Sequence, residues 1–588
     1  MFKITSRSLS VFVLFVLIGT TWNPQPALPS GKTCNWTAGS GIDFYWDDSD
    51  NWACIGGDGP PSDEDDAIIS SSLANAPIVR GSAAAKTLTL SGVLRIEAGA
   101  GLTVGTWTNQ GNATIDSQGT IVGNGEVTPS GTFHFLSSGT IIGNLTIDPL
   151  ATASVAVVFI QGNVLNNGTL TGESPDAQFH MQGLLFTNYG TVSTNAFYFE
   201  KGSGAVQEVN GSGAWNSGIN NLFVTNGTAL APQNDMTFGP QHFSIGDTGD
   251  RLNVGTFKVT FQNPAAVSNA GAIVGLAGGS VHTQGNSVYL GNTNEAQFTP
   301  PLVVENGLTY ASGVFSGTIT INQGGTLRVK ALPAGTITAV KDVTVTGSLD
   351  GENSDINFYM RGQNLVVDGS ISVAELHLAG VSQQTITGTG SLSLRDMYVD
   401  APGGVKLNAP LGLNGQLSLS QNLYVGSSTL VTLTESAITA GENSDKDIFG
   451  MVKRIGPFQT DKPYSFGNLN LTVVFTDVGS SLPAAITMTV NQAPWKDLPG
   501  SINRSYRIQT AGGSGWSGSL KLDYRDSELH GLEDYLQAWT RSSSSAPWAQ
   551  IPYSEAHFTQ NWISFQGLTH FSDWGLVIHS VLLPFVKR

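Results

Sequence analysis

The chain has 588 residues, of which 71 are glycine and 12% are charged, and its formal net charge is −17. A chain this poor in Lys and Arg lacks the positive charge that binding to nucleic acid or to anionic membranes requires, so neither is an expected partner. Its apolar content of 40% is ordinary for a folded protein, which excludes a disordered chain.

Residues 1–30 have the pattern of a secretory signal peptide. Lys3 and Arg7 give a positive start, and the apolar run from Val11 to Ile18 is too short to span a bilayer. No later segment is apolar enough to form a transmembrane helix. We therefore expect an exported protein that is secreted or held at the cell surface.

The segment 31–70 contains both cysteines, Cys34 and Cys54, and is predicted to form an N-terminal cap. A cysteine pair in an exported protein forms a disulfide more often than a metal site. No histidine lies between the two to complete a set of metal ligands. A disulfide that closes a loop of this length stabilises a fold by about 3 kcal/mol.

An acidic run that includes Asp63, Asp65 and Asp66 ends the same segment. Its carboxylates could bind Ca²⁺ through oxygen, but the run lacks the D-x-[DN]-x-[DN]-G spacing of a calcium loop. A turn-rich, solvated cap is the favoured interpretation and calcium is the alternative. No other cofactor is indicated.

The cap segment resembles a short N-terminal motif of secreted bacterial β-helix and adhesin-like proteins. The features that carry the resemblance are Trp46, Asn51-Trp52, Pro60-Pro61, Asp65-Asp66 and Ile68-Ile69. The resemblance implies that this segment covers the first coil of a solenoid. A solenoid needs such a cap because its end would otherwise expose backbone edges and an apolar cross-section.

Residues 71–445 are predicted to form an all-β solenoid, because they contain an internal duplication. The run NVLNNGTLTGESPDAQFHMQG at 163–183 aligns without a gap with DVTVTGSLDGENSDINFYMRG at 342–362, and the duplicated unit covers about 130–225 and 310–400. Residues 318–322 and 343–346 alternate apolar with Thr or Asn, as strands with one buried face do. We expect a right-handed parallel β-helix with coils of roughly 20–30 residues.

A Gly-Glu-x-x-Asp pattern recurs with the duplication. It supplies the pairs Glu173/Asp176 and Glu352/Asp355, with an echo at Glu442/Asp445. Paired carboxylates serve glycoside hydrolases and also bind Ca²⁺. An enzyme needs one site, however, whereas this pattern returns with the structural unit. Turns at the corners of the coils are therefore the favoured interpretation. No nucleophile, phosphate-loop or H-E-x-x-H motif is present, so the sequence predicts no enzyme.

Residues 446–578 are predicted to form a β-sandwich, because short strand-like runs alternate with Gly, Pro and Ser turns. The runs LPGSINRSYRI (498–508), LKLDYRDSEL (520–529) and GLTHFSDWGL (567–576) resemble C-terminal β-sandwich modules of secreted bacterial surface proteins. That resemblance implies a fold and a compartment, not an activity. The tail 579–588 resembles a short anchoring signal, and a last strand is the alternative.

Six of the chain's 12 tryptophans fall in this module, namely Trp495, Trp516, Trp539, Trp548, Trp562 and Trp574. Core filling is their favoured role. Aromatic faces beside polar groups also bind sugars. Because loops expose side chains, Trp516 in a Gly/Ser loop and Trp548 after a Ser run are the candidate sugar-binding residues.

We expect a non-enzymatic structural or adhesive protein, in which a solenoid stalk carries a sandwich module. Its expected partner is a polysaccharide or protein of the cell envelope or of the extracellular space. One alternative is a carbohydrate-binding or polysaccharide-cleaving protein, and another is a self-associating coat subunit. A polysaccharide enzyme should show a groove with clustered acids and aromatics along the coils, whereas a stalk should show Thr, Ser and Asn ladders.

Overall fold

The computed structural model describes residues 31–578 except 72, 74, 110–112, 118–119, 130–131, 203, 216–218, 263–265, 270, 276–277, 286–287, 293–297, 331–334, 354 and 442–445. The predicted signal peptide at 1–30 and the tail at 579–588 lie outside the described residues. So do Glu442 and Asp445 of the third acidic pair.

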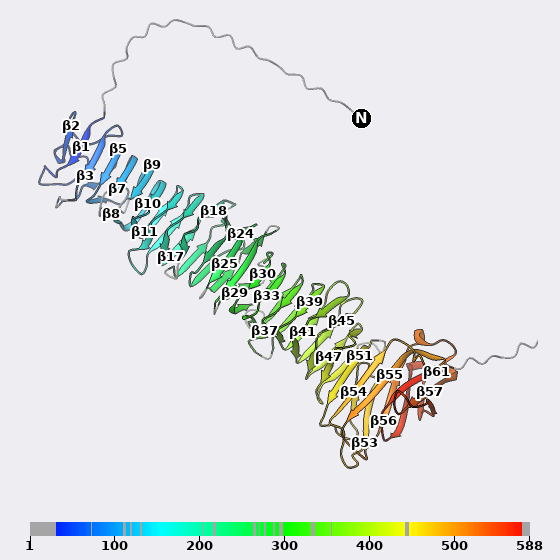
Figure 1. The fold of residues 1–588 in the computed structure, drawn as a ribbon. Coiled ribbons are helices and arrows are strands. Elements are labelled where there is room, and N and C mark those ends of the chain that lie inside the picture. Colours follow the sequence, from blue (N-terminus) through cyan, green and yellow to red (C-terminus); the bar gives the residue numbers. More distant parts are fainter. Residues whose placement is uncertain are drawn as a thin grey trace, which may run out of the picture.

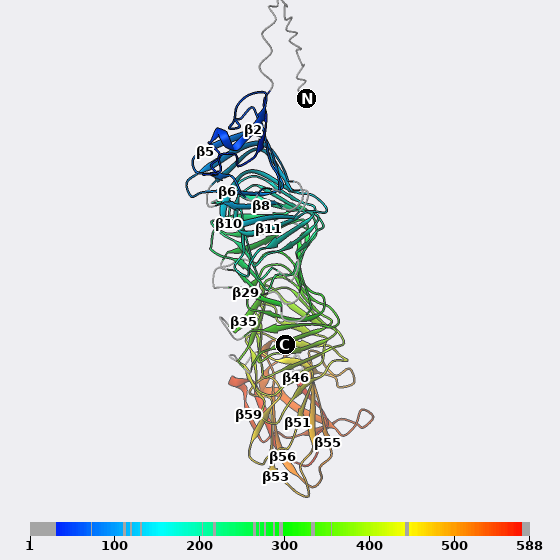
Figure 2. The same ribbon diagram turned by 90° about the vertical axis from the view of Figure 1, so that its left-hand side faces the viewer.

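The described chain is nearly all β and forms a long rod (Figure 1). One end carries the hairpin of β1 (Thr33–Trp36) and β2 (Trp52–Ile55), and about 15 turns of parallel solenoid follow. The view turned by 90° shows the same elongated shape (Figure 2). The helices in the described residues are three-residue 3₁₀ turns: η1 (Ser49–Asn51), η2 (Asp526–Glu528), η3 (Glu533–Tyr535) and η4 (Phe558–Gln560). None of them is long or apolar enough to cross a membrane.

The first coils are built from long strands that bend around corners. After the short strand β3 (Asp66–Ile69), these strands are β5 (Ser82–Leu90), β7 (Gly101–Asn109), β9 (Thr120–Pro129), β10 (Thr132–Ile147) and β11 (Thr152–Ile160). β1 pairs in parallel with β3, so the cap hairpin continues directly into the solenoid. β11 then pairs with two different strands of the next coil, and from there each coil gives one strand to each of three faces.

The three faces are named after their strands in the first regular coil. The β12 face contains β12 (Val164–Asn166), β15 (Leu185–Asn188), β18 (Val206–Asn210), β21 (Ala229–Pro232), β24 (Arg251–Gly255), β27 (Ala272–Gly275), Phe298, β32 (Gly313–Phe315), β35 (Thr336–Ala339) and β38 (Asn357–Met360). The β13 face contains β13 (Thr169–Gly172), β16 (Thr191–Ser193), β19 (Ala214–Trp215), β22 (Met236–Phe238), β25 (Lys258–Gln262), β28 (Ser280–Gln284), β30 (Leu302–Val304), β33 (Ile319–Ile321) and β36 (Val343–Val345). The β14 face contains β14 (Gln178–Met181), β17 (Ala196–Phe199), β20 (Asn221–Val224), β23 (His242–Ile245), β26 (Ala266–Asn269), β29 (Val288–Asn292), β31 (Gly307–Ala311), β34 (Gly325–Val329) and β37 (Ser348–Gly351).

The predicted alternation is confirmed in these strands. In β33, Ile319 and Ile321 point into the core and Thr320 points outward, and β36 repeats the pattern. Neighbouring strands therefore stack Ile on Val along the inside of the rod. This arrangement stabilises the coils through apolar burial and through the backbone ladder at the same time.

The duplication is visible strand by strand, but its second copy is turned about the rod axis. β12, β13 and β14 correspond in sequence to β36, β37 and β38 at a constant offset, with Val164 matching Val343 and Met181 matching Met360. β36 nevertheless stacks on the β13 face, β37 on the β14 face and β38 on the β12 face. Corresponding residues of the two copies thus lie on different faces of the solenoid.

A buried glutamine side chain bonds to the corresponding bend of the chain in each copy of the duplicated unit. The Gln207 side chain donates to the carbonyls of Met181 (2.8 Å) and Gly183 (2.6 Å). Gln384 donates to the corresponding carbonyls of Met360 (3.0 Å) and Gly362 (2.6 Å). The Met181 and Met360 carbonyls also accept backbone N–H groups of the next coil, so each glutamine adds a second bond there and satisfies the carbonyl of Gly183 or Gly362 at the bend.

The rod ends in two antiparallel sheets that pack face to face, which confirms the predicted all-β solenoid followed by a sandwich. The β12, β13 and β14 faces end at β50 (Ile438–Gly441), β48 (Leu423–Val425) and β49 (Val431–Leu433). The first sheet contains β51 (Ile448–Ile455), β54 (Ala485–Asn491), β55 (Ser501–Ala511), β61 (Asp573–Ile578), β57 (Leu536–Arg541) and β58 (Ala549–Ile551). The second contains β52 (Pro463–Ser465), β53 (Thr472–Asp477), β56 (Ser517–Asp523), β60 (Trp562–Leu568) and β59 (Glu555–His557).

Strand β51 belongs to both parts of the molecule. Its first half pairs in parallel with β48 and its second half with β49, while its other edge pairs antiparallel with β54. The solenoid and the module therefore share one uninterrupted hydrogen-bonded sheet.

Candidate functional site

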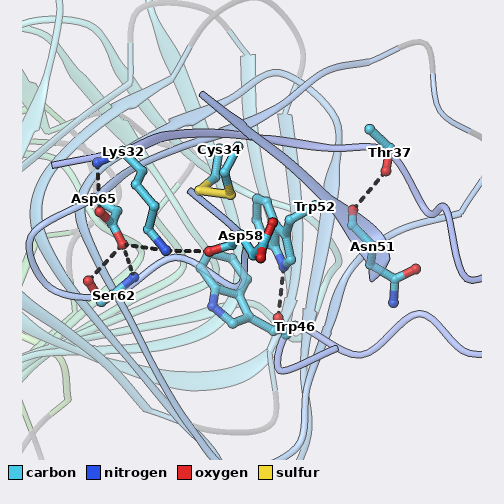
Figure 3. The surroundings of a disulfide bond; sticks show 10 residues. Lys32, Cys34, Thr37, Trp46, Asn51, Trp52, Asp58, Ser62 and Asp65 are labelled. Atoms are coloured by element: carbon cyan, nitrogen blue, oxygen red, sulfur yellow. Dashed lines mark hydrogen bonds and ion pairs between the residues drawn. A yellow bond between two sulfur atoms is a disulfide. The ribbon is translucent and has the colours of Figure 1, made fainter. Parts of the chain in front are cut away.

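The cap contains the predicted disulfide. Cys34 and Cys54 are direct partners in the β1–β2 hairpin and are bonded to each other (Figure 3). Trp52 packs edge-on against Trp36 and Trp46, with ring centroids 5.1 and 4.7 Å apart, and the Trp52 indole N–H donates to the Trp46 carbonyl at 2.8 Å. The tryptophans of the N-terminal motif thus form the small core of the cap.

The acidic residues of the cap do not form a cation site in the described structure. Asp65 is buried, and its carboxylate accepts from the Lys32 backbone N–H (2.7 Å) and from the Ser62 N–H and hydroxyl (2.9 and 2.7 Å; Figure 3). Burial opposes ionisation, but these hydrogen bonds outweigh it and lower the pKa of Asp65. Asp66 accepts from the Thr87 hydroxyl, and Asp63 lies in an exposed turn. Asp65 therefore fixes the turn, which is the favoured sequence interpretation.

Glu173 and Asp176 lie in the exposed turn that joins β13 to β14. The Asp176 N–H donates to the Ser174 hydroxyl at 3.3 Å, and Glu173 accepts from His134 of an earlier coil at 2.9 Å. Burial opposes ionisation of Glu173, but hydrogen bonds from Ser154 and His134 lower its pKa. The pair thus closes a corner and links neighbouring coils.

The second pair, Glu352 and Asp355, closes the turn that joins β37 to β38, and the Asp355 side chain is 84% exposed. Because the second copy is turned by one face, this turn lies at a different corner of the rod from the Glu173 turn. The two pairs cannot line one common groove. In the described residues no group of three or more His, Cys, Asp or Glu side chains could hold a metal ion.

Side-chain ladders run along the solenoid instead. Buried Asn166 donates to Asn188 of the next coil at 2.8 Å, and the hydroxyls of buried Thr283 and Thr309 are 2.7 Å apart. Aromatic ladders also occur, with His180 stacked on Tyr198 at 4.3 Å on the β14 face. In such a stack each ring covers its neighbour, so the rings present edges rather than open faces to solvent.

Of the two tryptophans predicted as sugar contacts, Trp516 is not at the surface. It is 4% exposed, and its ring packs 5.3 Å from Phe475 and 5.0 Å from Phe571. The expectation that its Gly/Ser loop would expose it is wrong, because Phe475 and Phe571 cover the ring. Trp516 is a core residue of the module.

Trp548 lies on the outer face of the first sheet, which is the face that points away from the second sheet. The centre of this face is a row of charges across three strands, in which Asp573 of β61 accepts from Arg507 of β55 (2.7 Å) and from Arg541 of β57 (3.0 Å). The bond to Asp573 raises the pKa of Arg507. Arg541 also donates to Asp497, and this bond outweighs desolvation to lower the pKa of Asp497.

The rings of Trp495 and Trp548 lie over this charge row. The Arg541 guanidinium is 5.0 Å from the Trp495 ring centre and 4.5 Å from the Trp548 ring centre, within the range of a cation–π contact. The Trp495 indole N–H donates to the Trp574 carbonyl at 2.8 Å. Gly575 of β61 leaves the space for this ring, since a Cβ there would lie 3.1 Å from it.

A depression of about 350 Å³ continues the outer face at the edge of the sheet. Tyr535 and Tyr553 line it and are 46% and 37% exposed, together with Gln537 of β57 and Gln550 of β58. Its volume falls in the range of about 300–1,000 Å³ that small-molecule sites occupy. Every second residue of β57 points to this outer face, and these residues are Gln537, Trp539 and Arg541.

The sequence interpretation gave Trp495 and Trp539 a core-filling role and did not single out Arg541. A usable signal was present, because the strand-like run at 536–540 puts Gln537 and Trp539 on one side of a strand by simple alternation. Alternation along one strand does not show which other strand pairs beside it. The contact of Trp495 with Arg541 joins residues from distant segments through the pairing of β61 with β55 and β57.

A second polar cluster is buried at the junction of solenoid and module. The fully buried Arg504 side chain of β55 contacts Asp447, Asp523 (3.2 Å) and Glu528 (2.9 Å), and Arg525 contacts Asp447 as well. Three carboxylates thus face two guanidinium groups. Burial, together with the neighbouring carboxylates of Asp447 and Glu528, raises the pKa of Asp523 to about 7. Burial also raises the pKa of Glu528 and outweighs the opposing effect of the two guanidinium groups. The cluster joins the segment before β51 to the sandwich.

No protein-family model, no curated protein and no solved structure matches this chain.

Proposed function

We propose that this chain is an exported, non-enzymatic structural or adhesive protein, in which the solenoid is a stalk and the sandwich is the module that it presents. The observation that carries the proposal is the shared strand β51. It joins a long rod to a compact module without a linker, so the position of the module is fixed by backbone hydrogen bonds. Such a joint suits presentation at a distance from an anchoring point.

The polysaccharide-cleaving alternative has less support. Its candidate acids lie in turns at different corners of the rod, and stacked rings such as His180 and Tyr198 occupy the β14 face. Hydrolysis of a glycosidic bond needs two carboxyl groups about 5–10 Å apart on either side of one bond. The recurring pairs serve the turns instead, which favours a stalk.

Small-angle scattering of the mature protein tests the stalk. With strands about 4.8 Å apart, the roughly 15 turns should give a solenoid roughly 70 Å long, extended further by cap and module. We expect the asymmetric pair-distance distribution of a rigid rod, unchanged with protein concentration. A compact particle would contradict the stalk, and growth of the particle with concentration would favour the coat-subunit alternative.

An assay for sugar release tests the non-enzymatic part of the proposal. Incubation with insoluble and soluble polysaccharides should release no reducing sugar. Release that Glu173→Gln or Glu352→Gln abolishes would establish a hydrolase and would overturn the proposal.

A further inference from the structure

We propose that the outer face of the first module sheet, along β57, is a binding site for an uncharged glycan. This inference rests on the proposed function, because it names the ligand class of the module that the stalk presents. The site runs from the depression at Tyr535 and Tyr553, past Trp539, to the pair Trp495 and Trp548.

The distribution of tryptophans in the module is the first observation. Trp516 and Trp574 fill the core, and Trp562 is buried beneath Lys521 and His557. Trp495, Trp539 and Trp548 instead gather, half-buried, on the outer face of one sheet. These three lie outside the space between the two sheets, so packing between the sheets does not account for them, although Trp495 also covers Gly575 on the outer face.

The second observation is the arrangement of polar groups between the aromatic rings. Gln537, Trp539 and Arg541 follow one another on the same side of β57, and Gln550 lies opposite Trp539 on β58. The distance from Gln537 to Arg541 along the strand is roughly 13 Å, which is longer than a single sugar ring. Aromatic surface for C–H groups and side-chain amides for hydroxyl groups occur side by side, as recognition of a sugar chain requires.

The charges on the outer face of the first sheet indicate which class of glycan would bind there. Arg507 and Arg541 are both paired with Asp573, and Arg541 is paired with Asp497 as well. The two cations and two anions of these ion pairs balance, and exposed Lys496 beside Trp495 and exposed Asp534 at the depression add one charge of each sign. These residues give the face no excess of positive charge that would attract a sulfated or uronic chain. Charge complementarity therefore favours a neutral glycan, whose hydroxyl groups can bond to the exposed side chains of Arg507 and Asp497, whereas Arg541 and Asp573 are buried.

The experiment is isothermal titration of the full mature protein with four uncharged hexasaccharides, built from β-1,4-linked glucose, xylose, mannose and N-acetylglucosamine. A hexamer of galacturonic acid serves as the acidic probe. We expect at least one uncharged hexasaccharide to bind more tightly than the acidic one. Trp548→Ala and Trp539→Ala should each weaken that binding at least tenfold. Tyr189→Ala, which removes a 55% exposed aromatic ring from the solenoid, should leave it unchanged.

If a tryptophan variant fails to fold, the glycan affinity of Tyr553→Ala and Gln550→Ala tests the site instead, because these residues line the depression. Binding to none of the four uncharged probes, tighter binding of the acidic probe, or wild-type affinity in the variants would each overturn the glycan site. If any of these results is obtained while the scattering is that of a rod, the glycan site is wrong but the proposed stalk is still supported. A compact particle that still binds the glycan would overturn the stalk alone.

Discussion

Gly575 lies in the middle of the outer face, beneath Leu498 and the ring of Trp495. A Cβ at this position would lie 2.4 Å from a Leu498 methyl carbon and 3.1 Å from Trp495. We predict that Gly575→Ala lowers the free energy of unfolding of the module by about 1–3 kcal/mol, the usual cost of overfilling a packed site. Urea unfolding followed by tryptophan fluorescence measures the change.

Gly412→Ala is the matched control, because Gly412 also lies inside a strand, β46 (Leu411–Leu413), yet its nearest neighbour would be 3.7 Å from the new carbon. We expect this variant to be as stable as the wild type or slightly more stable, since alanine restricts the unfolded chain. Equal effects of the two substitutions would show that Gly575 makes no special space for Trp495.

At the scale of single residues, the sequence predicted the pairing and burial of some side chains correctly, but not the exposure of others. The disulfide partners and the alternating Ile residues follow from spacing and period, which are local properties of the chain. The exposure of Trp516 and Trp548 does not. Both follow Gly- or Ser-rich runs, but Phe475 and Phe571 cover one ring and Arg541 lies under the other. That difference depends on which strands become neighbours.

Among the structural elements, the junction cluster around Arg504 predicts a pH dependence. Burial raises the pKa of Asp523 to about 7, whereas an unfolded aspartate has a pKa near 3.9. The folded module therefore keeps a proton that the unfolded chain loses, so the contribution of Asp523 to stability is fully present below about pH 4 and is lost as pH rises through 7. We predict that the Tm of the module decreases between pH 5 and pH 8, because this group lowers the free energy of unfolding by at most about 1.4 kcal/mol per pH unit.

Asp523→Asn keeps the neutral form at every pH, and calorimetry should show a flatter dependence and a higher Tm at pH 8 than in the wild type. Asp355→Asn, at a carboxylate whose side chain is 84% exposed, should leave the slope unchanged. A module whose Tm rises between pH 5 and pH 8 would mean that the buried carboxylates are ionised and held by Arg504 and Arg525.

That the solenoid consists of short alternating strands was predictable, because the duplication and the two-residue period are visible in the sequence, whereas the long strands of the first coils were not predicted. The face that each strand occupies was not. An alignment of the two copies matches β12 with β36, but only the pairing of strands over the whole region between them shows that β36 stacks on the β13 face. That β51 pairs with both the solenoid and the module could not be predicted for the same reason, since its sequence does not show which strands become its neighbours.

For the whole molecule, the rod geometry predicts that damage at one end stays local, because each coil contacts only its neighbours. Removing the Cys34–Cys54 disulfide by Cys34→Ser with Cys54→Ser should destabilise the cap by about 3 kcal/mol. By hydrogen exchange, amides of β1 to β3 should exchange up to about 100-fold faster. Amides of β36 to β38 should exchange as in the wild type, and loosening at both sites would show that the rod unfolds as one unit.

The turned second copy has a consequence for how such a gene lengthens. A duplicated stretch of DNA need not encode a whole number of turns, because each of the three faces accepts the same inward alternation. Only the spacing of strands and bends within the inserted piece must match that of its host. Stalk length can therefore evolve in steps finer than one coil, while the cap at one end and the module at the other are left untouched.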